Sequence, residues 1–269
     1  MNFLLELLNS SMQTPKAYAS FLESWFHYLS LLILVISTYF FAKKFKTSTV
    51  PQTKKILLMS GLLMIFLEIY KQVIFTYQAG HYQWYAFPFQ FCSTPMYLFT
   101  IYGISKNKKI DTYLLSFLAT YSTFAGIAVM LYPADVFIPT IGINIQTMIH
   151  HGLMASIGIS LLITKIEFKF KGFLKGSLVF LILLVVALSM NLLFNLSTID
   201  QTFNMFFINE RFGNHIPILS LIEPHVNSIT FLMIYFIGFS FVAALIWVIG
   251  LLIKKSLYKE KINISEIFA

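Results

Sequence analysis

Seven long apolar stretches constrain the fold of this chain more than any other feature. Each has close to the ~20 residues that a helix needs to cross a bilayer. Helices satisfy the backbone groups of such runs internally, as lipid requires. We therefore predict an all-α membrane protein with seven transmembrane helices in a single domain, residues 1–269. The expected spans are approximately 22–42, 56–77, 86–105, 111–132, 141–163, 172–196 and 228–253.

The composition supports this class and argues against others. The chain is 58% hydrophobic and 11% charged, whereas soluble domains carry about 25% charged residues. The net charge of +8 is better explained by topology-determining lysines that touch anionic lipid headgroups than by a nucleic-acid partner. The single cysteine, Cys92, excludes an internal disulfide. With no metal-binding spacing and no glycine-rich phosphate loop, we expect neither a metal nor a cofactor.

The positive charges predict the orientation. Sixteen of the nineteen Lys and Arg residues lie in four segments, residues 43–55, 106–109, 165–175 and 254–261, which alternate with segments almost free of positive charge. Positively charged loops stay in the cytoplasm. We therefore expect the N-terminus outside and the C-terminus in the cytoplasm. The strong preference for lysine over arginine favours a multi-pass protein of a bacterial cytoplasmic membrane.

Polar residues share one depth in the expected helices. At ~1.5 Å per residue, the outer half of the membrane holds Glu68, Lys71, Cys92, His150 and His151. The same layer contains His27, Gln90, Asn144, Gln146 and Asn191. Since polar groups in hydrocarbon require partners, their common depth predicts one pocket that opens to the outside. Alternatively, they could only join helices, with Glu68 and Lys71 neutralising each other.

Cys92 is the candidate nucleophile of this layer. Pro88 suits the first turn of a helix, which would place Cys92 about one turn inside it, near the positive end of the helix dipole. Pro95 is then expected to kink the helix beside Cys92. A thiolate paired with a histidine is a nucleophile for acyl transfer. The alternative is a small hydrophobic residue without chemistry.

A family resemblance lies in the same residues. The stretches FPFQFCSTPMYL, SWFHYL, FAGIAVMLYP and NIQTMIHHGLM resemble the YwaF-like bacterial integral membrane proteins. These proteins are similar to a eukaryotic membrane acyltransferase that makes polyunsaturated ether phospholipids through a cysteine and a histidine. The resemblance implies Cys92 as the cysteine and His150 as the histidine, with the adjacent His151 as the alternative. The loop over residues 197–227 departs from the family pattern.

We therefore expect a lipid acyltransferase or transacylase that acts on a membrane phospholipid. Cys92 would form a thioester, and His150 or His151 would act as the base. Glu68 would orient a histidine or pair with Lys71. Candidate donors to the tetrahedral oxyanion are Asn144, Gln90 and Asn191. The alternatives are a proton-linked transporter or a ligand-binding membrane protein that uses the same polar layer. The apolar clusters of residues 197–227 suggest that this loop lies on or dips into the interface.

Overall fold

The computed structural model describes residues 2–258. Over this range the chain is helical apart from its connections and one isolated β-bridge, between Ser11 and Thr140. The all-α prediction is confirmed. Within the described range, six helical segments are long and apolar enough to cross a membrane: Phe21–Thr47, Val50–Ala79, Lys108–Leu131, Ile141–Thr164, Phe170–Asn195 and Ser228–Ser256. The predicted count of seven is not confirmed, because the region of residues 86–105 contains only a short helix.

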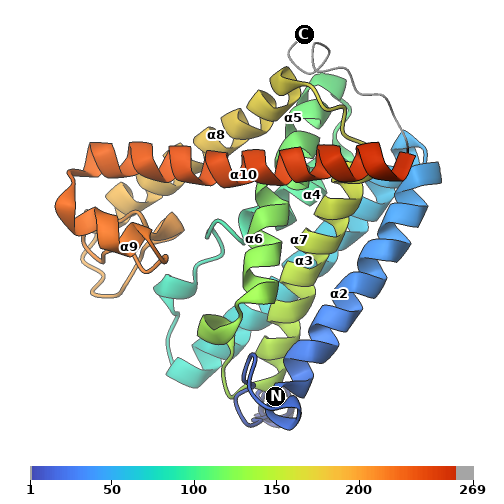
Figure 1. Cartoon of the computed structure of the whole chain (residues 1–269). Coiled ribbons are helices and arrows are strands. Elements are labelled where there is room, and N and C mark those ends of the chain that lie inside the picture. Colours follow the sequence, from blue (N-terminus) through green and yellow to red (C-terminus); the bar gives the residue numbers. More distant parts are fainter. Residues whose placement is uncertain (1, 259–269) are drawn as a thin grey trace.

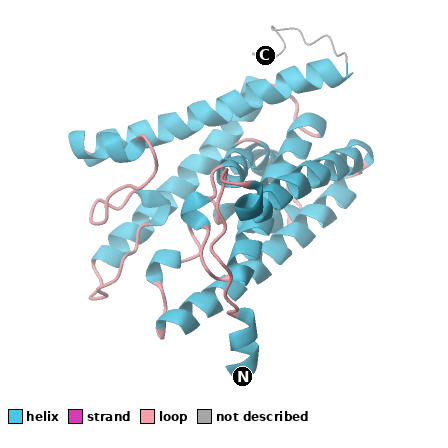
Figure 2. Ribbon diagram, turned by 60° about the horizontal axis from the view of Figure 1, so that its bottom comes forward, coloured by secondary structure: helices cyan, strands magenta, loops and turns pink. Residues whose placement is uncertain are grey.

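Most of the long helices form one bundle, and the last helix crosses it. In chain order the elements are α1 (Asn2–Leu8), α2 (Phe21–Thr47), α3 (Val50–Ala79), η1 (Trp84–Ala86), α4 (Thr94–Ile104), α5 (Lys108–Ala119), α6 (Tyr121–Leu131), η2 (Ala134–Val136), α7 (Ile141–Thr164), α8 (Phe170–Asn195), η3 (Met205–Phe207), α9 (Leu219–Ile222), η4 (Glu223–His225) and α10 (Ser228–Tyr258). Figure 1 shows α10 crossing in front of α6 and α7, both of which it contacts. Figure 2 shows α1 projecting from the edge of the bundle.

Local capping signals set the sharp turn between α2 and α3. Thr49 and Gln52 form a reciprocal capping box at the start of α3, in which each side chain accepts a hydrogen bond from the backbone N–H of the other residue. Pro51 occupies the first turn of the helix, where its missing N–H has no intrahelical acceptor. At the other end, Gly80 adopts the left-handed conformation (φ 72°) that commonly terminates helices.

The prediction of a helix over residues 86–105 is wrong for the first half of that range. Residues 87–93 form no helix, and α4 begins at Thr94. Pro95 lies in the first turn of α4, so it begins the helix and does not kink it. The expected span 111–132 is also interrupted. It consists of α5 and α6, which meet at Thr120, where the hydroxyl donates to the Ser116 carbonyl.

Close packing against α3 holds the short helix α4 in place. A Cβ atom at Gly103 would lie 2.5 Å from Leu58 Cβ, so the two helices approach too closely for any side chain at this position. A Cβ atom at Gly61 of α3 would likewise lie 2.8 Å from the Thr100 backbone nitrogen and 3.0 Å from the Met96 carbonyl oxygen of α4. This contact fixes the position of the irregular segment that precedes α4.

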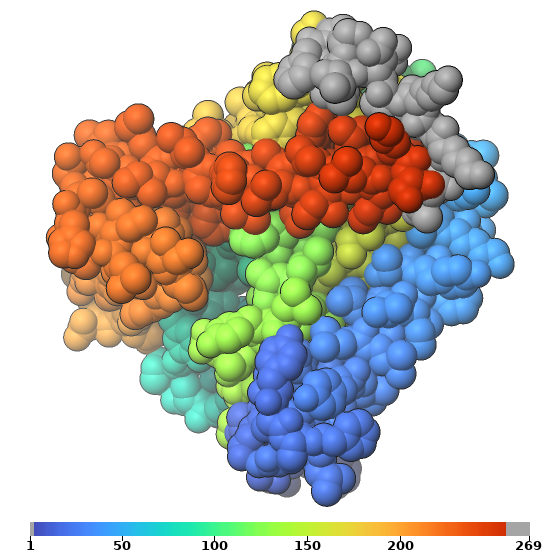
Figure 3. Space-filling view, in the orientation of Figure 1, coloured from blue at the N-terminus to red at the C-terminus, as the bar shows by residue number. Residues whose placement is uncertain are grey.

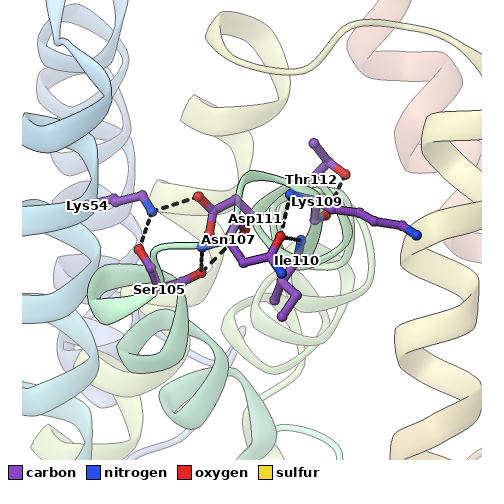
Figure 4. Close-up of polar contacts among 7 residues, drawn as sticks. All are labelled: Lys54, Ser105, Asn107, Lys109, Ile110, Asp111 and Thr112. Atoms are coloured by element: carbon purple, nitrogen blue, oxygen red, sulfur yellow. Dashed lines mark hydrogen bonds and ion pairs between the residues drawn. The ribbon is translucent and has the colours of Figure 1, made fainter.

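The basic segments gather at one end of the bundle, here called the basic end. Lys54 Nζ forms an ion pair of 2.6 Å with Asp111 and donates to the Ser105 carbonyl at 2.6 Å, as Figure 4 shows. Lys165 Nζ donates to the Ser48 carbonyl at 2.7 Å. Further links are Lys175 to Thr112 and Lys254 to the Ile166 carbonyl. Contacts between the described residues thus bring the four basic segments together, and Lys259 and Lys261 lie outside the described residues.

The long loop over residues 197–227 is partly built into the protein. Phe203, Met205 and Phe206 are almost completely buried, and they belong to the main hydrophobic core. The second apolar cluster of the loop, residues 216–222, instead contains two exposed side chains, Ile218 (71% exposed) and Leu221 (73% exposed). In Figure 3 this part of the chain, in orange, forms a bulky cap at one end of α10. Contact with a membrane interface therefore stays a prediction for the second cluster alone.

Candidate functional site

The turn that carries Cys92 is in direct contact with a histidine of α7. His150 Nε2 lies 3.0 Å from the Cys92 carbonyl oxygen, and the His150 side chain is buried. A carbonyl can only accept, so Nε2 must carry the proton of this hydrogen bond. In the neutral ring, Nδ1 is then an acceptor, and no described residue forms a hydrogen bond with it. The structure thus brings Cys92 and His150 together and leaves one ring nitrogen free to accept a proton.

Cys92 itself lies in a turn and not inside a helix. The Gln90 carbonyl accepts hydrogen bonds from the N–H groups of Ser93 and Thr94, at 2.8 and 3.1 Å, and Ser93 is the N-cap of α4. The expected position one helical turn inside a span is therefore wrong. The side chain of Cys92 is partly buried against the hydrophobic core. Within the described chain, Sγ has no hydrogen-bond partner.

The neighbouring histidine is engaged differently. His151 Nδ1 lies 2.8 Å from the Thr147 carbonyl, one turn earlier in α7, so its ring binds the backbone of its own helix. The rings of His150 and His151 lie 5.3 Å apart. Of the two histidines that the sequence left open, His150 alone contacts the Cys92 turn through a hydrogen bond between described residues.

A charged pair on α3 lies beside this turn. Glu68 Oε1 accepts from Lys71 Nζ at 2.8 Å and from Gln72 Nε2 at 2.7 Å. The mutual neutralisation that the sequence suggested for Glu68 and Lys71 is thus present. Glu68 is connected to the Cys92 turn through Gln72, which also donates to the Ala86 carbonyl. The Glu68–Lys71 pair is therefore linked to the segment that leads into that turn.

Gln72 was not among the residues that the sequence pointed to. Its Nε2 donates both to Glu68 and to the Ala86 carbonyl, at 2.7 Å each, so it ties α3 to the segment that leads into the Cys92 turn. A sequence signal was available, because Gln72 follows Glu68 by four residues and therefore lies on the same helix face.

Two of the expected oxyanion donors instead hold the long loop. Gln90 accepts from the Phe206 N–H at 2.9 Å and donates to the Asn204 carbonyl at 2.8 Å. Asn191 accepts from the Met205 N–H at 2.8 Å and donates to the Met205 carbonyl at 3.0 Å. Each amide thus uses its oxygen and one N–H to fix loop backbone. The long loop is thereby fastened to the residue that lies two positions before Cys92.

The remaining predicted residues have partners away from the Cys92 turn. Asn144 binds Ile138 through hydrogen bonds of 3.0 and 2.7 Å to its N–H and carbonyl. His27 Nε2 lies 2.9 Å from the Met130 carbonyl, which joins α2 to α6. Gln146 is buried and accepts only from the adjacent Thr147 in the described chain. None of these three contacts the Cys92 turn through a hydrogen bond between described residues. The residues of the predicted polar layer are therefore not joined by hydrogen bonds into one site in the described chain.

An apolar cavity of about 550 Å³ lies beside Glu68 and Gln72. It lies between the half of α3 away from the basic end and the segment around the Cys92 turn. Its lining is Leu5, Ile65, Glu68, Ile69, Gln72, Val73, Thr76, Tyr77, Tyr82, Pro88, Met96 and Tyr97. Burial, together with the charge of Glu68, raises the pKa of Tyr82. The cavity thus combines an apolar surface with one charged wall, an arrangement suited to a hydrocarbon chain beside a polar group.

No metal-binding cluster of three or more His, Cys, Asp or Glu side chains occurs in the described residues.

Comparison with known proteins assigns the family. The model of the TMEM164 family matches residues 20–251, from the residue before α2 into α10. No curated protein and no solved structure matches the chain. The matched range contains every hydrogen bond described above for the Cys92 turn. The resemblance to YwaF-like proteins and its acyltransferase link stay predictions. With six helices of membrane-crossing length in its described part, the chain is a multi-pass membrane protein that belongs to the TMEM164 family.

Proposed function

We propose that the protein is a membrane lipid acyltransferase or transacylase. Cys92 would take an acyl group from a phospholipid as a thioester and pass it to the hydroxyl group of a second lipid. The observation that carries this proposal is the contact of the buried His150 ring with the Cys92 carbonyl, together with the unpartnered Nδ1 of the same ring. A nucleophile and a base in adjacent positions are the minimum for this chemistry.

The proposed steps balance without a cofactor. His150 takes the proton of the Cys92 thiol as Sγ attacks the ester carbonyl carbon, so a C–S bond forms. The ester C–O bond then breaks, and the leaving oxygen receives the proton from His150. In the second half, His150 takes the proton of the acceptor hydroxyl as its oxygen attacks the thioester carbonyl carbon. A new ester C–O bond forms, the C–S bond breaks, and His150 returns the proton to Sγ. General acid–base catalysis by one residue contributes about 10²–10⁴-fold to such reactions.

The surroundings of the turn support a lipid substrate. The apolar cavity beside Glu68 and Gln72 could receive one hydrocarbon chain, while the polar group at its wall would face the ester region. We also propose that the basic end faces the cytoplasm, following the distribution of positive charge. Cys92 and the long loop would then lie in the outer half of the membrane, with the N-terminus outside. A bacterial cytoplasmic membrane stays a prediction.

Acylation of the thiol tests this function directly. Membranes that contain the wild-type protein would be supplied with a phospholipid bearing an alkyne-tagged acyl chain, and the label on the protein would be measured before and after hydroxylamine treatment. We expect a hydroxylamine-sensitive label on the wild type and none on Cys92→Ala. An unlabelled wild type, or equal labelling of Cys92→Ala, contradicts the proposal and favours the transporter or ligand-binding alternatives.

The adjacent histidines provide a matched pair of variants for the base. His150→Ala should slow thioester formation by about 10²–10⁴-fold, because the proposed base is lost. His151→Ala removes a ring of the same size from the next position, and the hydrogen bond of that ring between described residues goes to the Thr147 carbonyl of its own helix. It should therefore retain most of the wild-type rate. The reverse order of effects would show that His150 is not the base.

A further inference from the structure

Tyr235 of α10 has a completely buried hydroxyl group without a hydrogen-bond partner among the residues that the structure describes. Burial of an unpaired polar group is unfavourable, and such groups in folded proteins call for an explanation. Tyr121 provides the contrast in the same core. It is equally buried, but its hydroxyl lies 3.0 Å from Ser177 Oγ and 2.8 Å from Ser240 Oγ. The free hydroxyl of Tyr235 is therefore not a general property of tyrosines in this core.

Tyr235 lies in an aromatic cluster that includes Phe91, the residue before Cys92. Its ring stacks on Phe239 with 4.5 Å between centroids, and Phe239 meets Phe91 edge to face at 5.0 Å. Phe91 directly precedes Cys92, whose side chain packs against the same core. The unpartnered donor and the candidate nucleophile thus belong to one buried region.

The turn itself offers further donors. The N–H groups of Phe91 and Cys92 have no acceptor in the part of the chain that the structure describes. They precede the first hydrogen bonds of the turn, which run from Ser93 and Thr94 to the Gln90 carbonyl. Backbone N–H groups beside a nucleophile are the donors that most often stabilise the negative oxygen of acyl-transfer intermediates. Gln90 and Asn191, in contrast, already bind the loop.

We propose that the Tyr235 hydroxyl and the Cys92 N–H bind the oxyanion that forms when the Cys92 thiol attacks an ester carbonyl. This inference rests on the proposed acyltransferase function. As the C–S bond forms, the π electron pair of the carbonyl moves onto its oxygen, and the thiol proton moves to His150. Tyr235 donates a hydrogen bond to that oxygen and keeps its proton. When the electron pair returns, the ester C–O bond breaks and Tyr235 is again unpartnered.

Tyr235→Phe tests the hydroxyl while it preserves the ring. Loss of one oxyanion donor should slow thioester formation by about 10²–10³-fold. Because the hydroxyl is unpaired in the resting protein, the thermal unfolding midpoint should stay the same or rise. Tyr121→Phe is the matched control, since it removes a paired hydroxyl from the same core. It should lower the unfolding midpoint and leave the acylation rate of the folded protein close to wild type.

Alkylation of the same thiol separates an oxyanion role from other roles. Iodoacetamide reacts with Cys92 without forming an oxyanion, so Tyr235→Phe should leave its rate within about twofold of wild type while acylation slows. Unchanged acylation, or equal slowing of both reactions, would overturn the assignment of Tyr235. If the wild type forms no thioester, the proposed function fails and this inference fails with it. If the wild type is acylated and Tyr235→Phe is acylated as fast, only the oxyanion role is contradicted.

Discussion

The basic end and the Cys92 turn both bury polar groups, but they treat them in opposite ways. At the basic end, Lys54 binds Asp111 and the Ser105 carbonyl, so both charges are compensated even though one oxygen of Asp111 lacks a partner. At the Cys92 turn, His150 Nδ1 and, in the adjoining core, the Tyr235 hydroxyl are buried without a hydrogen-bond partner among the described residues. The first arrangement joins helices, while the second leaves a donor and an acceptor free for a ligand. Other buried groups of the described chain, such as His27 Nδ1 and Trp247 Nε1, also lack partners, so an unpaired group points to the candidate site only together with Cys92.

The largest expected effect on stability concerns the Lys54–Asp111 ion pair at the basic end. Lys54→Met removes the partner of a nearly buried carboxylate and should destabilise the protein by about 3–5 kcal/mol, because Asp111 is left as an uncompensated charge. Thermal unfolding in detergent would measure it. The double variant Lys54→Met/Asp111→Leu should recover much of the loss, since no charge is then unpaired. Equal losses in the single and double variants would contradict a buried pair.

The next effect concerns the amide that fastens the long loop. Asn191→Leu leaves the Met205 N–H without its acceptor and the Met205 carbonyl with only the Ile208 N–H at 3.4 Å, so it should destabilise the protein by about 1–3 kcal/mol. Limited proteolysis should then cut within residues 197–227. Asn144→Leu is the matched control, because Asn144 makes the same pair of hydrogen bonds to Ile138. It should expose residues 132–140 to cleavage, and cleavage at the long loop in both variants would contradict the local role of Asn191.

A smaller effect should follow from narrowing the apolar cavity. Ile69→Trp adds bulk to its wall, and displacement of about two methylene groups of a bound chain corresponds to roughly a tenfold loss. Thioester labelling from a long-chain phospholipid should fall by that factor, while alkylation of Cys92 by iodoacetamide stays constant. Ile69→Leu preserves the volume and serves as the control. Undiminished labelling of Ile69→Trp would remove the cavity from the proposed substrate path.

The smallest effect belongs to an exposed ion pair near the same basic end. Glu167 and Lys169 lie 3.7 Å apart with side chains that are 83% and 58% exposed. Water screens such a pair, so Glu167→Ala should change stability by less than about 1 kcal/mol. Each variant removes one ion pair, so comparing the unfolding midpoint of Glu167→Ala with that of Lys54→Met shows how much the burial of a pair adds to its effect on stability. Similar shifts in both variants would show that burial of the Lys54 pair contributes little.

The Cys92 turn shows why prediction from the sequence was incomplete at the site. Residues 86–105 are apolar enough for a helix, yet Phe87, Phe89 and Phe91 alternate with other residues in a period of two. Phe87 packs on Phe203, and Phe89 and Phe91 pack on Phe206, so the long loop replaces the helical neighbours that a span would have had. Hydropathy records the apolar character of these rings but not the distant segment that they contact.

The sequence by itself determined the helical class and the clustering of the lysines, because helix length and charge are local properties of the chain. It offered Cys92 and the two histidines as candidates. Only the tertiary structure decided that His150 and not His151 contacts the Cys92 turn, that Gln90 and Asn191 hold a loop, and that the Tyr235 hydroxyl has no partner among the described residues. The physical reason is that the partner of a polar group can lie far away in the sequence, 116 positions for Gln90 and Phe206. Composition and periodicity do not encode those contacts.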